Sequence, residues 1–271
     1  MPKHRLIATL LVNEGHVVQT RKFKRTNVIG NAFTAVDFFN SWAVDEIMVL
    51  EISRDAAHLA KFVEIVEGLS RRCFVPLTVG GKIRDVDMVT TYTRAGADKI
   101  VINTNAVRTP ELIRDVADAF GTQCVVVSID ARPDESMPSG YRVVVENGTV
   151  DTELDAVRWA QAAADHGAGE IMVNSIDHDG DKRGYDLALV RRVARHIPIP
   201  LIAMGGVGKW DDLVAGITEG GADAAAAGNI FHYTEHSTKK AKEHMMAAGL
   251  PMRRSEFYKV NMPRRPKYRP F

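Results

Sequence analysis

Short apolar runs alternate with longer amphipathic stretches along most of this chain. The apolar runs predict eight strands, at residues 5–11, 47–51, 75–79, 99–103, 124–130, 170–174, 200–204 and 223–227. Helical periodicity predicts helices between most of them, at residues 57–69, 85–95, 110–120, 154–166, 187–196 and 210–219. Helices that alternate with eight strands predict an α/β fold, a (β/α)8 TIM barrel. The nearly continuous apolar character of the strands agrees, because barrel strands are covered on both faces.

Two pairs of similar segments indicate that the barrel consists of two half-barrel repeats. Residues 78–82 (TVGGK) resemble residues 203–207 (AMGGV), and residues 95–98 (AGAD) resemble residues 220–223 (GGAD). In both pairs the two segments lie about 125 residues apart in the sequence. A unit of four strands that is duplicated once gives the eight strands of a closed barrel.

Composition narrows the class of protein. The chain has 271 residues, 45% of them hydrophobic and 25% charged, which is typical of a globular protein. It has no apolar run of about 18 residues, so we expect no membrane partner, and its start shows no cleavable signal. Two cysteines are too few for a disulfide framework or a cysteine-rich metal site. We therefore expect a cytoplasmic protein with no metal and no cofactor.

Charge is uneven along the chain. The net charge is +1, but residues 253–271 hold seven Lys and Arg against Glu256 alone. We therefore expect a barrel domain at residues 1–252 and a basic, aromatic, Pro-containing extension at 253–271. The extension is either a surface segment or an arm that docks a partner or an acidic ligand. The remainder of the chain is net acidic, so no nucleic-acid partner is indicated.

Polar residues and glycines follow the predicted strands, where the active sites of such barrels lie. Glycines there let backbone N–H groups approach an anion, so we expect one phosphate cradle in each half-barrel and a phosphorylated small-molecule ligand. Tight-turn geometry alone is the alternative for each glycine pair. The candidate binding residues in these positions are Gly80, Gly81, Asn103, Thr104, Asn174, Gly205, Gly206, Gly208, Gly228 and Asn229.

Asp130 ends the predicted strand 124–130, so its carboxylate is expected at the barrel mouth. It is a candidate general acid or base, or alternatively a helix cap or loop brace.

Four charged residues begin or precede predicted strands at the opposite end: Arg5, Glu46, Lys99 and Glu170. Two positive and two negative side chains at matching depth are able to form a salt-bridge ring across the barrel bottom. Such a ring either has a function or only seals and stabilises the barrel.

Together these residues resemble the cyclase subunit of imidazole glycerol phosphate synthase, over roughly residues 3–250. The resemblance rests on Gly80-Gly81, Ala97-Asp98-Lys99, Ile102-Asn103-Thr104, Ser128-Ile129-Asp130, Ser175-Ile176-Asp177, Asp179-Gly180, Gly184-Tyr185-Asp186 and Ile230-Phe231-His232. It implies a barrel whose bottom face docks a glutaminase subunit. In that family, ammonia passes through a charged gate and the barrel interior to a bisphosphorylated ribulosyl aminoimidazole substrate, which is cleaved and cyclised.

The resemblance assigns roles to individual residues. It implies that Arg5, Glu46, Lys99 and Glu170 form the gate and that Asp98 faces the glutaminase. Asn103, Thr104, Gly206 and Gly208 match phosphate-contacting turns. Lys82, in the first phosphate turn, and Asp179 and Gly180, in a matching motif, are also candidate ligand-binding residues. Asp130 matches one of two catalytic aspartates.

The sequence departs from the family pattern at the barrel mouth. Leu11 stands at the position of the other catalytic aspartate, and a leucine cannot transfer a proton. Loss of one acid–base group typically costs about 10²–10⁴ in rate. Further departures are Gln19 for a lysine, Glu51 for an aspartate, Lys82 for a glycine, Asn174 for a threonine and Met204 for a serine.

An intact gate beneath an altered mouth favours a paralogue that delivers ammonia to a different reaction. Paralogues of this kind serve surface-polysaccharide pathways, in which a separate ATP-dependent sugar amidotransferase converts an N-acetylated sugar to an acetamidino sugar. The resemblance therefore implies such an enzyme as a third partner, with the extension as its docking element. One alternative is the histidine-pathway cyclase itself, and another is a non-catalytic scaffold that activates the glutaminase.

Overall fold

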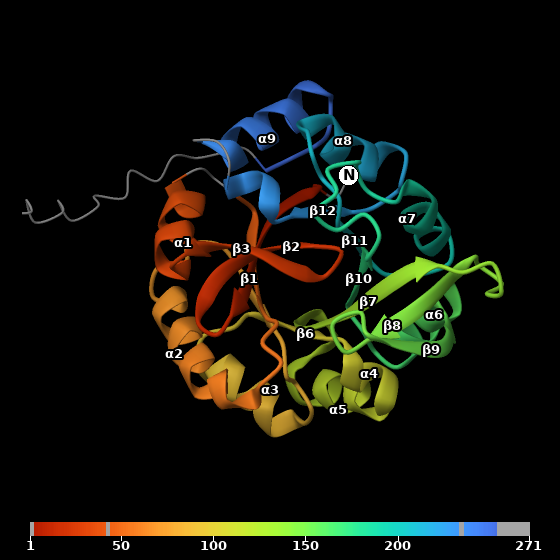
Figure 1. Cartoon of the computed structure of the whole chain (residues 1–271), viewed down its shortest axis with the longest axis horizontal. Coiled ribbons are helices and arrows are strands. Elements are labelled where there is room, and N and C mark those ends of the chain that lie inside the picture. The colour runs from red at the N-terminus through yellow and green to blue at the C-terminus, as the bar shows by residue number, and fades with distance from the viewer. Residues whose placement is uncertain (1–2, 42–43, 233–235, 254–271) are drawn as a thin grey trace, which may run out of the picture.

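Eight parallel strands form a closed ring at the centre of the computed structural model (Figure 1), which describes residues 3–41, 44–232 and 236–253. In ring order they are β1 (Arg5–Asn13), β4 (Glu46–Glu51), β5 (Leu77–Gly80), β6 (Lys99–Ile102), β7 (Val125–Pro133), β10 (Glu170–Ser175), β11 (Leu201–Met204) and β12 (Ala224–Ala227). The ring closes where β12 pairs with β1, with Ala224 opposite Arg5. The predicted (β/α)8 barrel is confirmed.

Helices surround the ring (Figure 1). They are α1 (Ala32–Ser41), α2 (Leu59–Ser70), α3 (Val86–Arg94), α4 (Thr104–Arg108), α5 (Glu111–Phe120), α6 (Ala156–Asp165), α7 (Leu187–Ala194), α8 (Trp210–Thr218) and α9 (Ser237–Ala247), with short 3₁₀ turns η1 (Ala56–His58), η2 (Thr122–Cys124) and η3 (Asn229–His232). Aspartates cap three helices: the carboxylates of Asp85, Asp155 and Asp186 accept hydrogen bonds from backbone N–H groups of the first turns of α3, α6 and α7.

Strand side chains alternate between two cores, because successive residues of a strand point to opposite faces. The outward core packs the strands against the helices. The inward core fills the barrel and contains Ile7, Met48, Val101, Val126, Met172, Ile202, Met204, Ala224 and Ala226, with Leu11 and Leu50 packed against it. The barrel interior is therefore apolar over much of its height.

Two antiparallel hairpins, which the pattern of apolar runs did not predict, extend from the ring. The strands β2 (His16–Arg21) and β3 (Lys24–Gly30) follow β1, and β8 (Tyr141–Val145) and β9 (Val150–Asp155) follow β7. The predicted helix at 154–166 is corrected accordingly: Leu154 and Asp155 end β9, and α6 begins at Ala156. A hairpin after the first strand of each half agrees with two half-barrel repeats.

The described chain ends beside its beginning. Met252 forms a parallel bridge with His4, and the His4 N–H donates to the Pro251 carbonyl at 2.9 Å. Residues 254–271, which hold most of the predicted basic extension, lie outside the described residues. Within the described residues, no helix has the length and apolar character to cross a bilayer.

Candidate functional site

Arg5, Glu46, Lys99 and Glu170 form a closed ring of ion pairs at the N-terminal ends of the barrel strands, here called the floor ring. Arg5 donates to Glu46 at 2.8 Å and to Glu170 at 2.6 and 3.1 Å. Lys99 donates to Glu46 at 2.9 Å and to Glu170 at 2.8 Å. Each cation therefore contacts both carboxylates.

The floor ring is largely buried, which strengthens its charge interactions. The Glu46 side chain is 1% exposed, and its second oxygen accepts a hydrogen bond from the Thr78 hydroxyl at 2.7 Å. Burial favours the neutral form of Glu170, but the hydrogen bonds and charges of Arg5 and Lys99 outweigh this and lower its pKa. Glu170 is thus held in its ionised form at neutral pH.

Aspartates fix the strand ends that carry the floor ring. Asp45 precedes Glu46 and accepts from the Leu6 N–H at 3.0 Å, and Asp98 precedes Lys99 and accepts from the Leu77 N–H at 2.8 Å. Asp223, the half-repeat counterpart of Asp98, accepts from the Leu201 N–H at 2.9 Å. Each carboxylate links the start of one strand to the neighbouring strand by a hydrogen bond. These aspartates therefore stabilise the barrel, whether or not Asp98 also faces a glutaminase.

A buried ion pair supports the same end of the barrel. Lys242 of α9 is completely buried, and its ammonium donates to Asp45 at 2.6 Å. The Arg253 guanidinium lies 3.7 Å from the same carboxylate. Asp45 thus links β1, β4 and the C-terminal helix beside the floor ring.

At the other end, here called the mouth, Asp130 lies on β7 and is 8% exposed. Asn103 donates to its carboxylate at 3.1 Å and to the Ser128 carbonyl at 3.0 Å. Burial raises the pKa of Asp130 to about 7, against the opposing hydrogen bond from Asn103, and the charge of Asp179 raises it further. A carboxyl group that titrates near neutral pH is suited to proton transfer.

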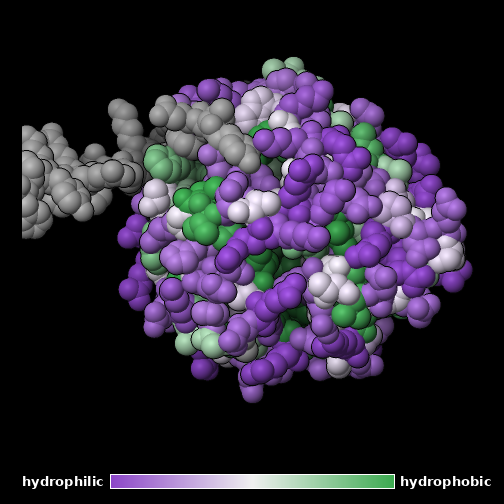
Figure 2. All heavy atoms as spheres, viewed as in Figure 1, coloured by the Kyte–Doolittle hydropathy of each residue, from purple (hydrophilic) through white to green (hydrophobic). Residues whose placement is uncertain are grey.

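Leu11 stands on the opposite side of the mouth. It lies on β1, four strands from β7 in either direction around the ring. Its neighbours in the inward core include Leu50 and Met204. One side of the mouth is therefore apolar, and Asn103, Asp130 and Asn174 make the other side polar. Figure 2 shows hydrophobic residues at the centre of this face, surrounded by hydrophilic side chains.

Asn174 is the register neighbour of Asp130 on β10. It is buried, and its Oδ1 atom has no hydrogen-bond partner among the described residues. The oxygen lies against Gly205, where a Cβ would come within 2.4 Å of it. A buried acceptor without a partner is costly, so this atom is available to a ligand that carries a donor.

The second half-barrel has an open cradle, here called the second cradle, formed by Gly205, Gly206, Gly208, Gly228 and Asn229. These residues line a pocket, except Gly208, which follows the lining residue Val207. The other lining residues are Leu11, Asp179, Gly180, Lys182, Met204 and Ala227. Gly205 and Gly206 have φ values of +92° and +101°, which favour glycine. The second cradle therefore opens directly onto Leu11.

The first cradle consists of Gly80, Gly81, Lys82, Asn103 and Thr104. Gly80 serves packing, since a Cβ there would come within 2.8 Å of both Leu50 and Val101. Gly81 has a φ of +110° and approaches the Glu51 carbonyl. Lys82 has a φ of +59°, which is strained for a side chain, and its ammonium donates to the Arg54 carbonyl at 3.1 Å.

Asp179 holds the β2–β3 hairpin over the mouth. Its carboxylate accepts from the Phe23 N–H at 3.0 Å, and its carbonyl accepts from the Lys22 N–H at 2.8 Å. Gly180 packs against the backbone of Thr20, and Asn229 donates to the Thr20 carbonyl at 2.9 Å. The resemblance placed Asp179 and Gly180 near the ligand, and the structure gives both a contact with this hairpin.

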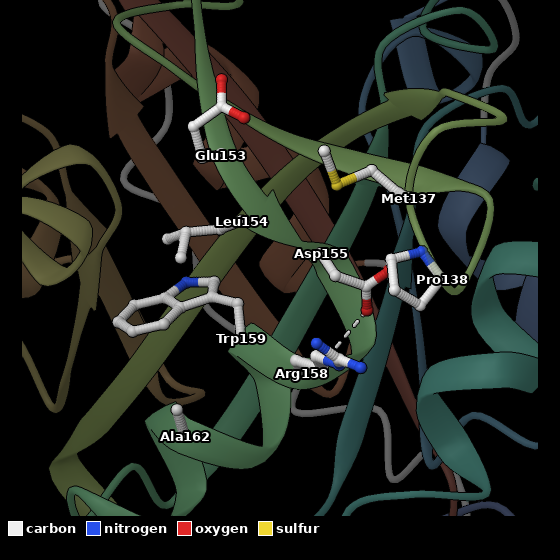
Figure 3. A pocket seen from close by; sticks show the side chains of 8 residues that line it. All are labelled: Met137, Pro138, Glu153, Leu154, Asp155, Arg158, Trp159 and Ala162. Carbon is white, nitrogen blue, oxygen red and sulfur yellow. Dashed lines mark hydrogen bonds between the residues drawn. The ribbon is translucent and has the colours of Figure 1, made fainter.

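A second pocket lies apart from the mouth, on β9, α6 and the loop before β8 (Figure 3). It has a volume of about 320 Å³ and is lined by Met137, Pro138, Glu153, Leu154, Asp155, Arg158, Trp159 and Ala162. None of these belongs to the floor ring or to either cradle, and Asp155 serves as the α6 cap. We therefore place the candidate site at the mouth.

Comparison with known proteins agrees with this geometry. The model of the family described as "Histidine biosynthesis protein" matches residues 5–237. The chain is also 42% identical over 255 residues to a Vibrio vulnificus (strain YJ016) protein named "Putative imidazole glycerol phosphate synthase subunit hisF2", with 94% of this chain and 93% of that protein covered. This chain belongs to the histidine biosynthesis protein family. The resemblance to the cyclase-type subunits is confirmed.

Two further departures of this histidine biosynthesis family member lie away from the barrel interior. Glu51 follows the inward-facing Leu50, so it points outward; its Oε1 atom accepts from the Ser53 N–H at 2.6 Å, and burial raises its pKa. Gln19 is buried on β2 and its Oε1 atom accepts from the Asn27 amide at 3.3 Å. These substitutions therefore alter the surroundings of the mouth, whereas Leu11 and Met204 alter the mouth itself.

Proposed function

We propose that this chain is the barrel subunit of a cytoplasmic glutamine amidotransferase complex. A glutaminase subunit docks on the N-terminal face, and ammonia passes the floor ring and the apolar interior to the mouth. The acceptor reaction is amidation of an N-acetylated sugar in surface-polysaccharide biosynthesis, carried out with an ATP-dependent sugar amidotransferase.

The complete floor ring beneath a mainly apolar inward core carries the proposal. A ring that only stabilised the barrel would gain little from two buried carboxylates and two half-buried cations, because desolvation offsets much of the attraction of such ion pairs. Above the ring, the inward core is mainly apolar, and neutral ammonia loses less hydration on entering it than ammonium does. The geometry therefore suits transport of ammonia.

Lys99 is the member of the floor ring that moves most easily. Arg5 holds Glu170 with two nitrogens, which fixes the guanidinium, whereas Lys99 holds each carboxylate through one ammonium on a flexible chain. Displacement of Lys99 opens one side of the ring and leaves three of its members paired.

The absence of a carboxylate at Leu11 supports an acceptor reaction other than the family's cyclisation. Leu11 faces Asp130 across the mouth, so a two-carboxylate cyclisation has no second acid–base group at that position. Release of ammonia to another enzyme needs no such group. The predicted extension is proposed as a docking element for that enzyme.

Lys99→Ala tests the delivery of ammonia in the complex of barrel, glutaminase and sugar amidotransferase. We expect product formation from glutamine to fall at least tenfold relative to glutamine hydrolysis, and product formation from ammonium chloride to stay within twofold. Glu153→Ala is the matched control, because the Glu153 side chain is 94% exposed and distant from the floor ring. Equal losses with glutamine and with ammonium would contradict delivery through the ring.

A second candidate is the histidine-pathway cyclase, favoured by the pKa of about 7 at Asp130. In that case Asp130 alone, or with a water molecule in the place of the missing carboxylate, transfers the protons. The name of the Vibrio vulnificus relative agrees with this candidate.

A further inference from the structure

Two hydroxyl side chains lie in the interior of the barrel, between the floor ring and the mouth. Ile7 and Leu11 on β1 belong to the inward face, and so does Val126 on β7. Because alternate residues of a strand point to the same face, Thr9 on β1 and Ser128 on β7 also point inward. Both residues are buried, with exposed fractions of 1% and 6%.

The two hydroxyls occupy one level of the barrel and come from opposite sides of it. In the strand register, Thr9 lies two residues beyond the partner of Glu46, and Ser128 lies two residues beyond the partner of Glu170. The strands β1 and β7 lie four strands apart in the ring and are the first strands of the two halves. Thr9 and Ser128 are therefore counterparts in the half-repeat, each one inward-facing position above a glutamate of the floor ring.

The Thr9 hydroxyl has no hydrogen-bond partner among the described residues. Valine has nearly the same shape and would fill this position without burying an unpaired polar atom, which is costly. A threonine on the inward face of a mainly apolar core therefore indicates a transient partner that forms hydrogen bonds. Such a partner must be small, because protein interiors are closely packed.

Methionines flank both hydroxyls and are able to make room for a small molecule. Met48 is the register neighbour of Thr9, and Met172 is that of Ser128. Met204 also belongs to the inward core. The unbranched methionine side chain has three rotatable bonds and adapts its shape readily. A molecule with one heavy atom therefore needs only side-chain rotation to pass this level.

Neutral ammonia fits these hydroxyls better than ammonium does. A hydroxyl both donates and accepts hydrogen bonds. Ammonia is able to accept a hydrogen bond from the Thr9 hydroxyl and to donate one to the Ser128 oxygen, whereas ammonium only donates. Ammonium also carries a charge that is costly at a buried level with no counter-ion.

We propose that Thr9 and Ser128 form a hydrogen-bonding station for neutral ammonia between the floor ring and the mouth, here called the hydroxyl station. The station replaces part of the hydration that ammonia loses above the floor ring, and so lowers the barrier to its passage. The inference rests on the proposed function and deepens it, since it assigns two residues to the ammonia path.

Competition between two sources of nitrogen tests the hydroxyl station in the complex of barrel, glutaminase and sugar amidotransferase. The complex receives unlabelled glutamine and isotope-labelled ammonium chloride together, and mass spectrometry gives the ratio of unlabelled to labelled product. We expect Thr9→Val and Ser128→Ala each to lower this ratio about two- to tenfold, as for loss of one hydrogen bond. Thr9→Ser keeps a hydroxyl and should retain the wild-type ratio.

Thr93→Val is the matched control. The Thr93 hydroxyl on α3 is also buried without a partner in the described part of the chain, but it lies outside the ring of strands. Its loss should leave the ratio unchanged. In urea denaturation, Thr9→Val and Thr93→Val should be at least as stable as wild type, because each removes an unpaired buried polar group.

A wild-type ratio in either Thr9→Val or Ser128→Ala would overturn the hydroxyl station, and so would an equal fall in Thr93→Val or in Thr9→Ser. A loss of stability in Thr9→Val would also overturn it, because the hydroxyl would then have a structural partner. A wild-type complex that uses both sources in proportion to their concentrations would contradict ammonia delivery itself, and this inference with it. Failure of the station alone is therefore distinguishable from failure of the proposed function.

Discussion

Arg5 and Glu170 meet at the floor of the barrel in a two-pronged ion pair, with guanidinium nitrogens 2.6 and 3.1 Å from the two carboxylate oxygens. They come from β1 and β10, which lie 165 residues apart in sequence. Parallel, charge-assisted hydrogen bonds of this kind fix both position and orientation. The pair forms one side of the floor ring, opposite Lys99, which contacts both carboxylates through a single ammonium.

Glu170→Gln should destabilise the fold, because Arg5 and Lys99 would keep their charges and lose a shared partner. We expect a loss of about 1–3 kcal/mol in the free energy of unfolding at pH 7, below the value for a fully buried pair because the ring is partly exposed. The pKa of Glu170 is lowered in the folded chain, so its contribution is present above the unfolded value and is lost as the pH falls through the folded value. Urea denaturation at pH 7 and pH 3.5 should therefore show a smaller difference from wild type at the lower pH. An equal difference at both would contradict the assignment.

Asp130→Asn should stabilise the fold, and more so at higher pH. The folded pKa of Asp130, about 7, lies above the ordinary aspartate value, so the folded chain binds more protons than the unfolded chain between these values. As the pH rises from 4 to 7, the free energy of unfolding of the wild type should thus fall relative to that of the variant, by a total on the order of 2–4 kcal/mol. The measurement is urea denaturation of both proteins at pH 5 and pH 8. A difference that does not grow with pH would show that Asp130 titrates normally.

Lys242→Met should destabilise the fold by about 3–5 kcal/mol, because it leaves the Asp45 carboxylate buried without its closest cation. Asp45→Asn should also destabilise it, and the double variant should lose less than the sum of the two. Thermal and urea unfolding of the four proteins measure this coupling as a double-mutant cycle. Additive losses would mean that the two residues act independently.

The barrel and the floor ring follow from simple sequence features. Apolar runs at regular spacing predict the eight strands, and Arg5, Glu46, Lys99 and Glu170 each stand at the start of such a run. Because parallel strands start at the same end of a barrel, their first residues meet. Only the pairing of individual oxygens and nitrogens required coordinates.

The hairpins are harder to predict. The turn at Lys22 and Phe23 has φ values of +50° and +61° without a glycine or asparagine to signal it. The other turn does contain Asn147-Gly148, a hairpin signal that was available in the sequence. The contact of that turn with Thr104 joins residues 42 positions apart and depends on tertiary packing.

The burial of Lys242 and the outward orientation of Glu51 were likewise not predictable from the sequence. A lysine on a C-terminal helix is ordinarily exposed, and its burial follows from the position of Asp45, 197 residues earlier. Glu51 ends a strand, which is where active-site residues of such barrels lie. Its side chain nevertheless points outward, because successive residues of a strand point to opposite faces and Leu50 points inward.

The most direct test of the account is cyclase turnover with the ribulosyl aminoimidazole substrate and excess ammonium salt, which bypasses the glutaminase. Wild type should be compared with Leu11→Asp and Asp130→Asn. We predict no wild-type turnover, and some turnover in Leu11→Asp, where a carboxylate again faces Asp130. Wild-type turnover that Asp130→Asn abolishes would contradict it and establish a histidine-pathway cyclase.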